Sequence, residues 1–285
     1  MKFKPCFRFR TPRRETQLVP GIITLALFLT WNAHLSTTAG QPSVTSGTVF
    51  SETDPFHLCG REILTKDHHS SPASQYYIES IYWQVRTYPR GDIENLALLT
   101  IDDAPNKEST PGFLDLLDQY DARALFFING EPAQEHPDLI EAILDRGHQI
   151  GNHTWSHSSL LRLDRHQTEK EIVRLNEWLQ SEMDYSPRFF RPPYGNSTAY
   201  SDSVIAAQGM RNMGWSVAAY DWLYPENEQI NEHYPLIAER TMQAMYDGVI
   251  ILIHDWPVTL KALKVILQEL EKEGYELVDP AQIIH

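Results

Sequence analysis

Residues 96–103 read LALLTIDD, an apolar run that ends in two aspartates. A short continuous apolar run next to polar residues is typical of a buried strand. Similar runs recur along the chain, and stretches with the apolar spacing of helices alternate with them. This alternation predicts a parallel sheet covered by helices, either open or closed into a short barrel. The further expected strands are 124–128, 148–151, 189–191, 216–220, 249–253 and 275–278, and the expected helices are 111–119, 137–146, 164–179 and 260–274.

Polar side chains follow these strands where they end. Asp102 and Asp103 end the first strand, His153 and His157 follow the third, and Arg191 ends the fourth. Because the carboxyl ends of parallel strands converge on the ligand site in α/β folds, this clustering predicts an enzyme. The fifth and sixth strands end in the remaining members of the set, which are Asp221, Trp222, His254 and Asp255.

The metal-capable residues form a recognisable donor set. His153 and His157 are four residues apart, a spacing that brings two imidazoles to one ion, although two surface histidines show it as well. A carboxylate from another strand end, such as one of Asp102 and Asp103, completes a set of two histidines and one aspartate with open positions for water and substrate. That composition is typical of a catalytic metal site. The aspartate pair also has a structural interpretation, as a turn or helix cap ahead of Pro105.

Two further polar residues each have two interpretations. His254 follows a wholly apolar strand, so it is either a buried core histidine or a general acid for a leaving group. Arg191 serves either structure or catalysis, because both uses pair an arginine with a buried carboxylate. The residues alone leave these alternatives open.

The charge of the chain excludes some partners. A net charge of −14 argues against a nucleic-acid partner, because phosphates need a basic surface. Residues 1–40 hold six Lys and Arg against one acid, which leaves 18 basic and 37 acidic residues in 41–285, a net charge of −19. Long-range repulsion from this acidic body disfavours polyanionic ligands. The two cysteines, Cys6 and Cys59, exclude a disulfide-dense scaffold and a cysteine-rich metal site.

The N-terminal region has the pattern of an export segment. Residues 1–40 combine a basic stretch, an apolar run at 18–31 and a segment of small polar residues, as in a signal peptide. The run has about 14 residues against the ~20 that span a bilayer, and an N-terminal membrane anchor is the alternative. Either segment exports the protein, which is then secreted, periplasmic or anchored facing outward. We expect residues 41–94 to form a linker and N-terminal extension, with the aromatic-rich stretch 76–88 packed on a catalytic domain at 95–285.

Five ordered blocks at the strand ends resemble the polysaccharide deacetylases of the NodB-homology type, carbohydrate esterase family 4. The resemblance covers about residues 96–280, and its specificity comes from the occurrence of all five blocks in order. It implies an α/β fold, a distorted (β/α) barrel with about seven parallel strands. It also implies a hydrolase that removes N-acetyl or O-acetyl groups from glycans such as chitin oligomers, peptidoglycan or xylan. The blocks are TIDD at 100–103, HTWSH at 153–157, RPPYG at 191–195, YDW at 220–222 and LIHD at 252–255.

The resemblance further implies roles for individual residues. It implies a divalent metal, usually zinc with cobalt, manganese or nickel as alternatives, held by Asp103, His153 and His157. Asp102 would be the base that activates water, and His254 the acid that protonates the departing amine. The supporting residues would be Arg191 orienting Asp102, Asp221 pairing with His254, the Tyr194 backbone N–H holding the oxyanion, and Trp222 and Leu252 lining the acetyl pocket.

Two positions depart from the family pattern. Ala104 stands where the family usually has a glycine, which matters if that glycine needs a positive φ. Ala218 stands where a further aspartate often supports the acid histidine. The leading hypothesis is a metal-dependent hydrolase that deacetylates N-acetylglucosamine units of a glycan. The alternatives are a catalytically weak glycan-binding protein that retains the pocket, an O-acetyl esterase of the xylan type, and a hydrolase of another amide such as a cyclic ureide or a formamido sugar.

Overall fold

The structure, a computed structural model, describes residues 75–89, 91, 93–224 and 230–284. The predicted signal or anchor at 1–40, both cysteines and the expected linker up to residue 74 lie outside the described residues. The described residues belong to the second of two compact units, Lys66–His285. None of the helices in this part of the chain is long and apolar enough to cross a membrane.

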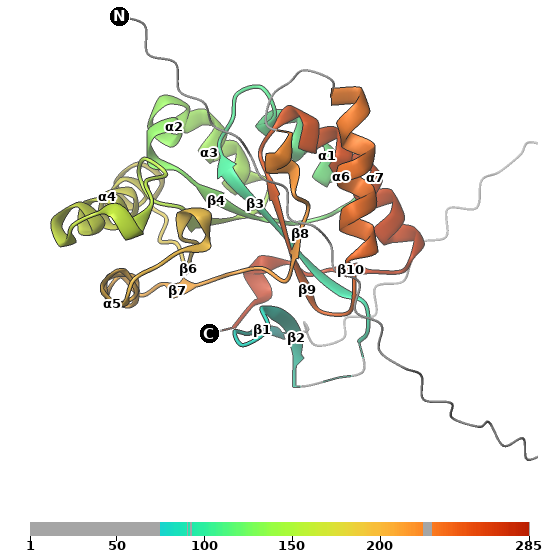
Figure 1. Cartoon of the computed structure of the whole chain (residues 1–285), viewed down its shortest axis with the longest axis horizontal. Coiled ribbons are helices and arrows are strands. Elements are labelled where there is room, and N and C mark those ends of the chain that lie inside the picture. The colour runs from blue at the N-terminus through green and yellow to red at the C-terminus, as the bar shows by residue number, and fades with distance from the viewer. Residues whose placement is uncertain (1–74, 90, 92, 225–229, 285) are drawn as a thin grey trace, which may run out of the picture. The chain divides into compact units, whose positions relative to one another are not determined.

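A curled sheet of ten strands forms the centre of this unit (Figure 1). The order is β1-β2-β9-β3-β4-β5-β6-β7, with β10 paired to β3 and β8 paired to β9. β1 and β2 pair antiparallel, β2 joins β9 antiparallel, and the other ladders are parallel. The strands are β1 (Gln75–Glu79), β2 (Gln84–Tyr88), β3 (Leu96–Ala104), β4 (Leu125–Ile128), β5 (Gln149–Asn152), β6 (Phe189–Phe190), β7 (Arg211–Asn212), β8 (Val217–Ala218), β9 (Val249–His254) and β10 (Glu276–Leu277).

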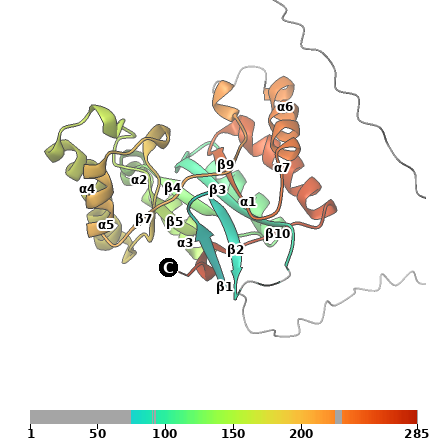
Figure 2. The same cartoon turned by 60° about the horizontal axis from the view of Figure 1, so that its bottom comes forward.

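Helices cover the outside of the sheet. In Figures 1 and 2, β3 and β9 lie side by side in the middle, with α6 and α7 on one side and α4 and α5 on the other. The helix α4 begins with a capping box, in which Asp164 and Gln167 exchange side-chain and backbone hydrogen bonds, as the sequence predicts. The helices are α1 (Thr110–Gln119), α2 (Gly130–Glu135), α3 (Pro137–Asp145), α4 (Arg165–Met183), α5 (Ala199–Ala207), α6 (Ile230–Gln243) and α7 (Pro257–Lys272).

The predicted fold class is confirmed, with a parallel-rich sheet that curls into part of a barrel. All seven predicted strands and all four predicted helices are present, with ends that differ by a few residues. Within the described ranges no ladder joins β7 to β8, so the barrel stays open on that side. The sequence did not predict β7, α2, α5 or α6. β7 has only two residues, which are too few for a periodic signal, and α6 contains Pro235.

The aromatic-rich stretch at 76–88 is part of the sheet. It forms the hairpin of β1 and β2, and Gln84 pairs with Val249 at the start of β9. The Val85 N–H donates to the Gly248 carbonyl over 2.8 Å. Tyr76 and Val85 are buried in the core on the inner side of the sheet. Among the described residues the sheet therefore begins at Gln75, twenty residues before the expected start of the catalytic domain.

The side chains of β3 alternate between two cores, as the period of two along a strand requires. Ala97, Leu99 and Ile101 face the large core under the helices, whereas Leu96 and Leu98 face the inner core of the barrel. Continuing the inner series places Thr100 and Asp102 inside the barrel, where both are buried. The strand thus carries one carboxylate into a largely apolar interior, where it needs a charged partner.

Candidate active site

A pocket of about 440 Å³ lies where the carboxyl ends of the strands meet. Its size falls in the range of small-molecule sites, ~300–1,000 Å³. Of the sequence-predicted site residues, Arg191 and Asp221 lie buried behind the pocket, each bonded to a residue that lines it. The other eight line the pocket themselves, namely Asp102, Asp103, His153, His157, Tyr194, Trp222, Leu252 and His254.

A β-bulge separates the two neighbouring aspartates. Asp102 pairs with Phe127 and Ala104 pairs with Ile128, so Asp103 is an extra residue in the ladder and has a φ of 63°. Ala104 returns to the outer core beside Ile101. The residue with the positive φ is therefore Asp103. Ala104 continues the strand, so an alanine fits at the position where the family usually has a glycine. The bulge turns Asp103 towards the histidines, while Asp102 stays inside the barrel.

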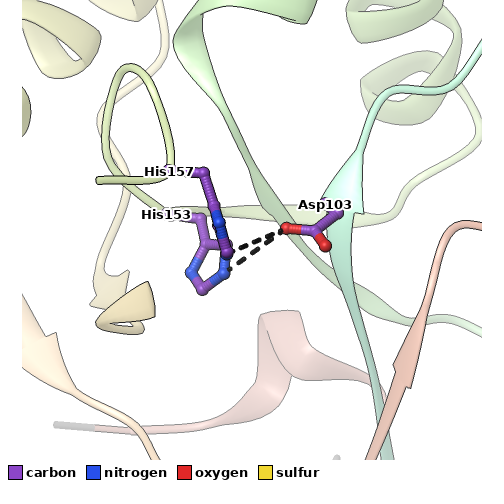
Figure 3. Close-up of side chains that lie close together, drawn as sticks. All are labelled: Asp103, His153 and His157. Carbon is purple, nitrogen blue, oxygen red and sulfur yellow. Dashed lines mark ion pairs between the residues drawn. The ribbon is translucent and has the colours of Figure 1, made fainter. Parts of the chain in front are cut away.

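Asp103, His153 and His157 form a group whose ligand atoms all lie within 4.8 Å of one another (Figure 3). Asp103 Oδ1 lies 3.3 Å from His157 Nε2 and 3.7 Å from His153 Nε2. This oxygen is buried and accepts no hydrogen bond from the described residues. Two imidazoles, one carboxylate and a carboxylate oxygen left without a donor fit a divalent cation such as zinc.

The ring orientation of His153 suits a metal ligand. Its Nδ1 lies 2.6 Å from the Arg191 carbonyl oxygen, which only accepts, so Nδ1–H is the donor and the Nε2 lone pair faces Asp103. Burial lowers the pKa of His153, although Asp102 and Asp103 oppose this effect. The neutral imidazole is the form that binds a metal.

The loop from His153 to His157 is fixed by its own side chains. Trp155 is buried between Gly130 and the guanidinium of Arg174, which lies 3.6 Å from the ring centroid. Trp155 therefore packs in the core rather than stacking on a sugar. The Asn129 side chain donates to the His153 carbonyl over 2.8 Å, which ties the loop to the end of β4.

Gly130→Ala should destabilise this loop, since the added Cβ would lie 2.2 Å from the Trp155 ring. We expect a loss of ~1–3 kcal/mol in the free energy of unfolding, as for other overpacked sites, together with weaker zinc binding. Urea unfolding in chelator and competition with a chromophoric chelator measure the two effects. Gly91→Ala is the control, because its φ lies outside the left-handed region and the nearest atom to the added Cβ is Thr87 Oγ1 at 3.5 Å, an ordinary contact. Unchanged zinc affinity in Gly130→Ala would contradict the assignment of Trp155 as the anchor of the ligand loop.

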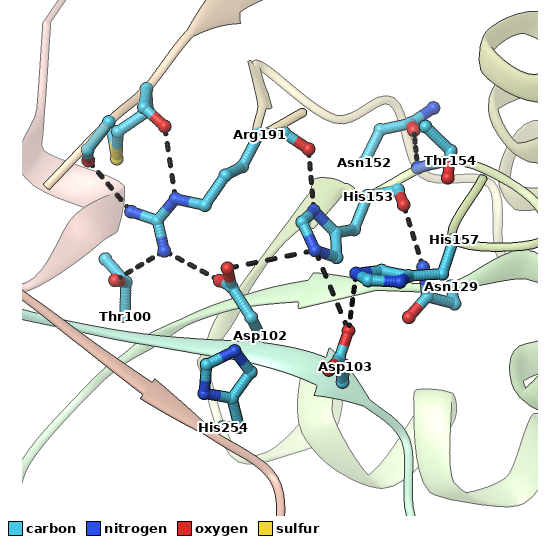
Figure 4. A network of polar contacts seen from close by, with 12 residues as sticks. Thr100, Asp102, Asp103, Asn129, Asn152, His153, Thr154, His157, Arg191 and His254 are labelled. Carbon is cyan, nitrogen blue, oxygen red and sulfur yellow. Dashed lines mark hydrogen bonds and ion pairs between the residues drawn. The ribbon is translucent and has the colours of Figure 1, made fainter. Parts of the chain in front are cut away.

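A buried ion pair holds Asp102 (Figure 4). Arg191 Nη1 donates to Asp102 Oδ1 over 2.6 Å and to Thr100 Oγ1 over 2.8 Å. The remaining guanidinium donors bond to the carbonyls of Met213 and Gly214 over 3.1 and 2.9 Å. The other carboxylate oxygen, Asp102 Oδ2, lies 3.8 Å from His153 Nε2. One oxygen is thus committed to Arg191, and the other faces the ligand group.

A second pair, between the His254 ring and the Asp221 carboxylate, holds His254. Its Nδ1 lies 2.7 Å from Asp221 Oδ1, and its backbone N–H donates to Asp221 Oδ2 over 2.7 Å. Thr259 donates to the same Oδ2, and Asp221 is fully buried. Ala218, where the family often has a further aspartate, lies on β8 beside Leu252. The carboxylate that bonds to the His254 ring is that of Asp221. Nδ1 is therefore committed to Asp221, which leaves Nε2 for the pocket that His254 lines.

Asp221 should control the protonation of His254. Burial lowers the pKa of His254, but the hydrogen bond and charge of Asp221, together with the charges of Asp102 and Asp103, outweigh burial and raise the pKa to about 9. Because the folded pKa exceeds the usual ~6.5, the protonated pair stabilises the fold fully below pH 6.5 and loses this effect as the pH rises through 9. In the metal-free protein, an NMR titration should give His254 a pKa near 9, and Asp221→Asn should bring it below about 7. The signal of His148, with a pKa that burial lowers to about 4, serves as the internal control and should not move. An unchanged His254 titration would contradict the assignment.

The remaining predicted residues form the walls of the pocket. Tyr194 has a φ of 60° in the turn Pro193–Gly195, and its exposed ring contacts the His157 ring edge to face at 4.8 Å. Trp222 contacts His254 edge to face at 5.6 Å, and Leu252 is buried beside them on β9. These positions suit the expected roles without testing them.

Sequence reasoning missed two tryptophans of the pocket. Trp256 stacks on His254 with ring centroids 4.7 Å apart, and it follows the LIHD block by one residue. Trp215 lines the pocket from the segment between β7 and β8. For Trp256, its position directly after the LIHD block could have indicated a pocket residue. Trp215 had no such signal, because no motif marks its segment and only the curl of the sheet brings it to the pocket.

Comparisons with known proteins show the family to which the chain belongs. A family model described as polysaccharide deacetylase matches residues 90–213. The peptidoglycan-N-acetylglucosamine deacetylase PgdA of Listeria monocytogenes is 30% identical over 73% of this chain, which spans only 42% of that relative's length. A peptidoglycan-N-acetylglucosamine deacetylase of Bacillus cereus is 32% identical, and the match covers 67% of this chain and 89% of the relative.

Solved structures agree with the sequence matches. Peptidoglycan deacetylase PdaC from Bacillus subtilis superposes with a TM-score of 0.59 at 32% identity, covering 66% of this chain and 89% of the other. The predicted resemblance is thus confirmed by sequence and by fold. The chain belongs to the polysaccharide deacetylase family, carbohydrate esterase family 4, with its NodB-homology barrel.

Proposed function

We propose that the protein is a metal-dependent hydrolase that removes N-acetyl groups from N-acetylglucosamine units of a glycan. One observation carries the proposal: Asp103, His153 and His157 form a cation-ready group in the same pocket as Asp102, which Arg191 holds, and His254, which Asp221 holds. A base and an acid on either side of a Lewis-acid site is an arrangement suited to metal-assisted amide hydrolysis. The names of the relatives favour peptidoglycan-type substrates.

The metal site fits the chemistry of the donor set. A divalent ion held by Asp103, His153 and His157, zinc in first place and cobalt, manganese or nickel as alternatives, would polarise the acetyl carbonyl and lower the pKa of water. Asp103 Oδ1 has no hydrogen-bond donor among the described residues, which leaves it available for the ion. The Arg191 carbonyl fixes His153 in the tautomer that presents Nε2.

Two residues of this chain, Asp102 and His254, each carry one of the two proton transfers. Asp102 accepts the proton of the attacking water at Oδ2, because Oδ1 is held by Arg191. As the C–N bond breaks, His254 Nε2 donates a proton to the departing amine, and Asp221 stabilises the protonated ring beforehand. The backbone N–H of Tyr194 donates to the carbonyl oxygen that gains charge. Trp222 and Leu252 contact the acetyl methyl, and the products are acetate and a free amine.

The proposal extends to the rest of the chain. Residues 1–40 act as a signal peptide or a membrane anchor, and residues 41–94 form a linker and an N-terminal extension whose hairpin of β1 and β2 is part of the sheet. A glycan outside the cytoplasm is then the substrate, in keeping with the peptidoglycan deacetylases among the relatives. A membrane contact arises only if the N-terminal segment is retained.

Acetate release from purified protein tests the function. We expect release from N-acetylglucosamine oligomers and peptidoglycan, at least a hundredfold loss in chelator, and recovery on adding zinc. Asp121→Asn, an acid with a 96% exposed side chain, is the matched control for site variants and should keep full activity. Release that persists in chelator contradicts the metal. Release from acetylated xylan alone identifies an O-acetyl esterase, and glycan binding without release identifies a binding protein.

A further inference from the structure

A second pocket of about 250 Å³ adjoins the catalytic pocket. The two pockets share Pro192, Gly195 and Trp215 as a common wall. The lining of the second pocket also includes Trp83, in the turn between β1 and β2, which lies before the residues matched by the family model. A ligand that fills the catalytic pocket can therefore continue over the common wall towards the hairpin.

The hairpin turn holds Trp83 firmly in this position. Trp83 is half-buried, has a φ of 51°, and packs on the inner core together with Trp215. A Cβ added at Gly214 would lie 2.5 Å from Trp83 Nε1, so the indole lies directly against the backbone there. The Gly214 carbonyl also accepts a hydrogen bond from Arg191. The second pocket is therefore preformed and joined to the buried network behind the first.

The lining of the second pocket has the chemistry of a sugar site. Trp83 and Trp215 offer aromatic surface for the C–H faces of a pyranose ring. Ser197 brings a hydroxyl to the same pocket, which suits the hydroxyl groups of a sugar. The Asn212 side chain is already engaged, because its Nδ2 donates to Asp202 over 2.7 Å and its Oδ1 is buried. Among the described residues no lysine or arginine side chain lines it, so a neutral ring fits better than an anionic group.

We propose that this pocket binds the sugar unit next to the one being deacetylated. The inference rests on the proposed function and narrows its substrate to an oligosaccharide of at least two units, with Trp83 as a specificity-determining residue. A single acetylated sugar or a small acetyl ester fills only the catalytic pocket and gains nothing from Trp83. The hairpin thereby selects for chain length.

Kinetics with a long and a short substrate test the inference. Trp83→Ala should lower kcat/KM for tetra-N-acetylchitotetraose about tenfold, mainly through KM, and should leave turnover of 4-nitrophenyl acetate unchanged within twofold. Trp83→Phe should restore most of the loss. Ile81→Ala, in the same turn but 79% exposed and not part of the pocket, is the matched control and should match the wild type. Ser197→Trp, which fills the pocket without removing Trp83, should reproduce the loss on the tetramer.

Two results would overturn the inference. Equal losses of Trp83→Ala on both substrates would show that Trp83 only supports the fold, and unchanged kinetics on the tetramer in both pocket variants would show that the pocket is not used. Calorimetric titration of the tetramer into each variant separates this test from the proposed function. Absence of acetate release by the wild type refutes the deacetylase, whereas tetramer affinity that Trp83→Ala leaves unchanged refutes the second pocket.

Discussion

Asp102→Asn is expected to lower kcat for acetate release about a thousandfold, the largest effect of any single change in the site. Asparagine keeps the shape of the side chain and still accepts the hydrogen bond from Arg191 Nη1, but it cannot take a proton from water. Asp102 is not one of the three proposed metal ligands, and the bulge separates it from Asp103. Zinc affinity should therefore stay within a few-fold of the wild type. Rates at saturating zinc, together with competition against a chromophoric chelator, separate the two effects.

The contrast with Asp103 sharpens this result. Asp103→Asn removes the carboxylate of the ligand group, so it should weaken zinc binding, and its activity should recover in part at high zinc. Asp102→Asn should show no such recovery. If Asp102→Asn keeps more than a tenth of the activity at saturating zinc, the proton is taken elsewhere and Asp102 is not the base.

Arg191→Met is expected to cost about 3–5 kcal/mol of unfolding free energy, the largest loss of stability from any change considered. Arg191 is fully buried and Asp102 is 3% exposed, so the change leaves an uncompensated carboxylate inside the barrel. It also removes the donors to Thr100 and to two backbone carbonyls. Urea denaturation of the metal-free protein measures the loss, because bound zinc would otherwise contribute.

A double-mutant cycle identifies the cause of that loss. The combined change Asp102→Leu with Arg191→Met replaces the ion pair with apolar side chains, and it should be more stable than Arg191→Met alone. Arg146→Met is the matched control, because Arg146 pairs with Asp115 at the surface, and its loss should stay below about 1 kcal/mol. A double variant no more stable than the single one would show that packing, and not the unpaired charge, dominates.

Much of the fold is predictable because its central strands are buried on both faces. The runs at β3, β4 and β9 are almost continuously apolar, and polar blocks follow where such strands end. The sequence therefore indicates the candidate metal ligands, the base and the acid, and all of these residues line one pocket. Their assigned roles stay predictions until the variants are measured.

The remaining features arise from tertiary contacts that leave little trace in local sequence. The two-residue strand β7 exists only through its neighbours, and Trp215, between β7 and β8, reaches the pocket because the barrel curls. The sequence predicts only an extension where the hairpin of β1 and β2 lies, because its pairing with β9 joins residues far apart in the chain. Without that pairing, nothing in the local sequence marks Trp83 as a site residue.

Because Asp103 lies in the bulge of β3, the proposed metal site could be removed by deleting one residue without changing the pairing of the sheet. Between Thr100 and Ala104, Asp103 is the one residue without a ladder partner on β4, and Ala104 already occupies the register position that follows Asp102. Deleting Asp103 would leave the remaining pairs aligned and the apolar layers intact, while removing one of the three proposed metal ligands. Loss of one residue would therefore remove the proposed cation site while the scaffold persists, and a designer could install such a site in a similar sheet by the reverse insertion.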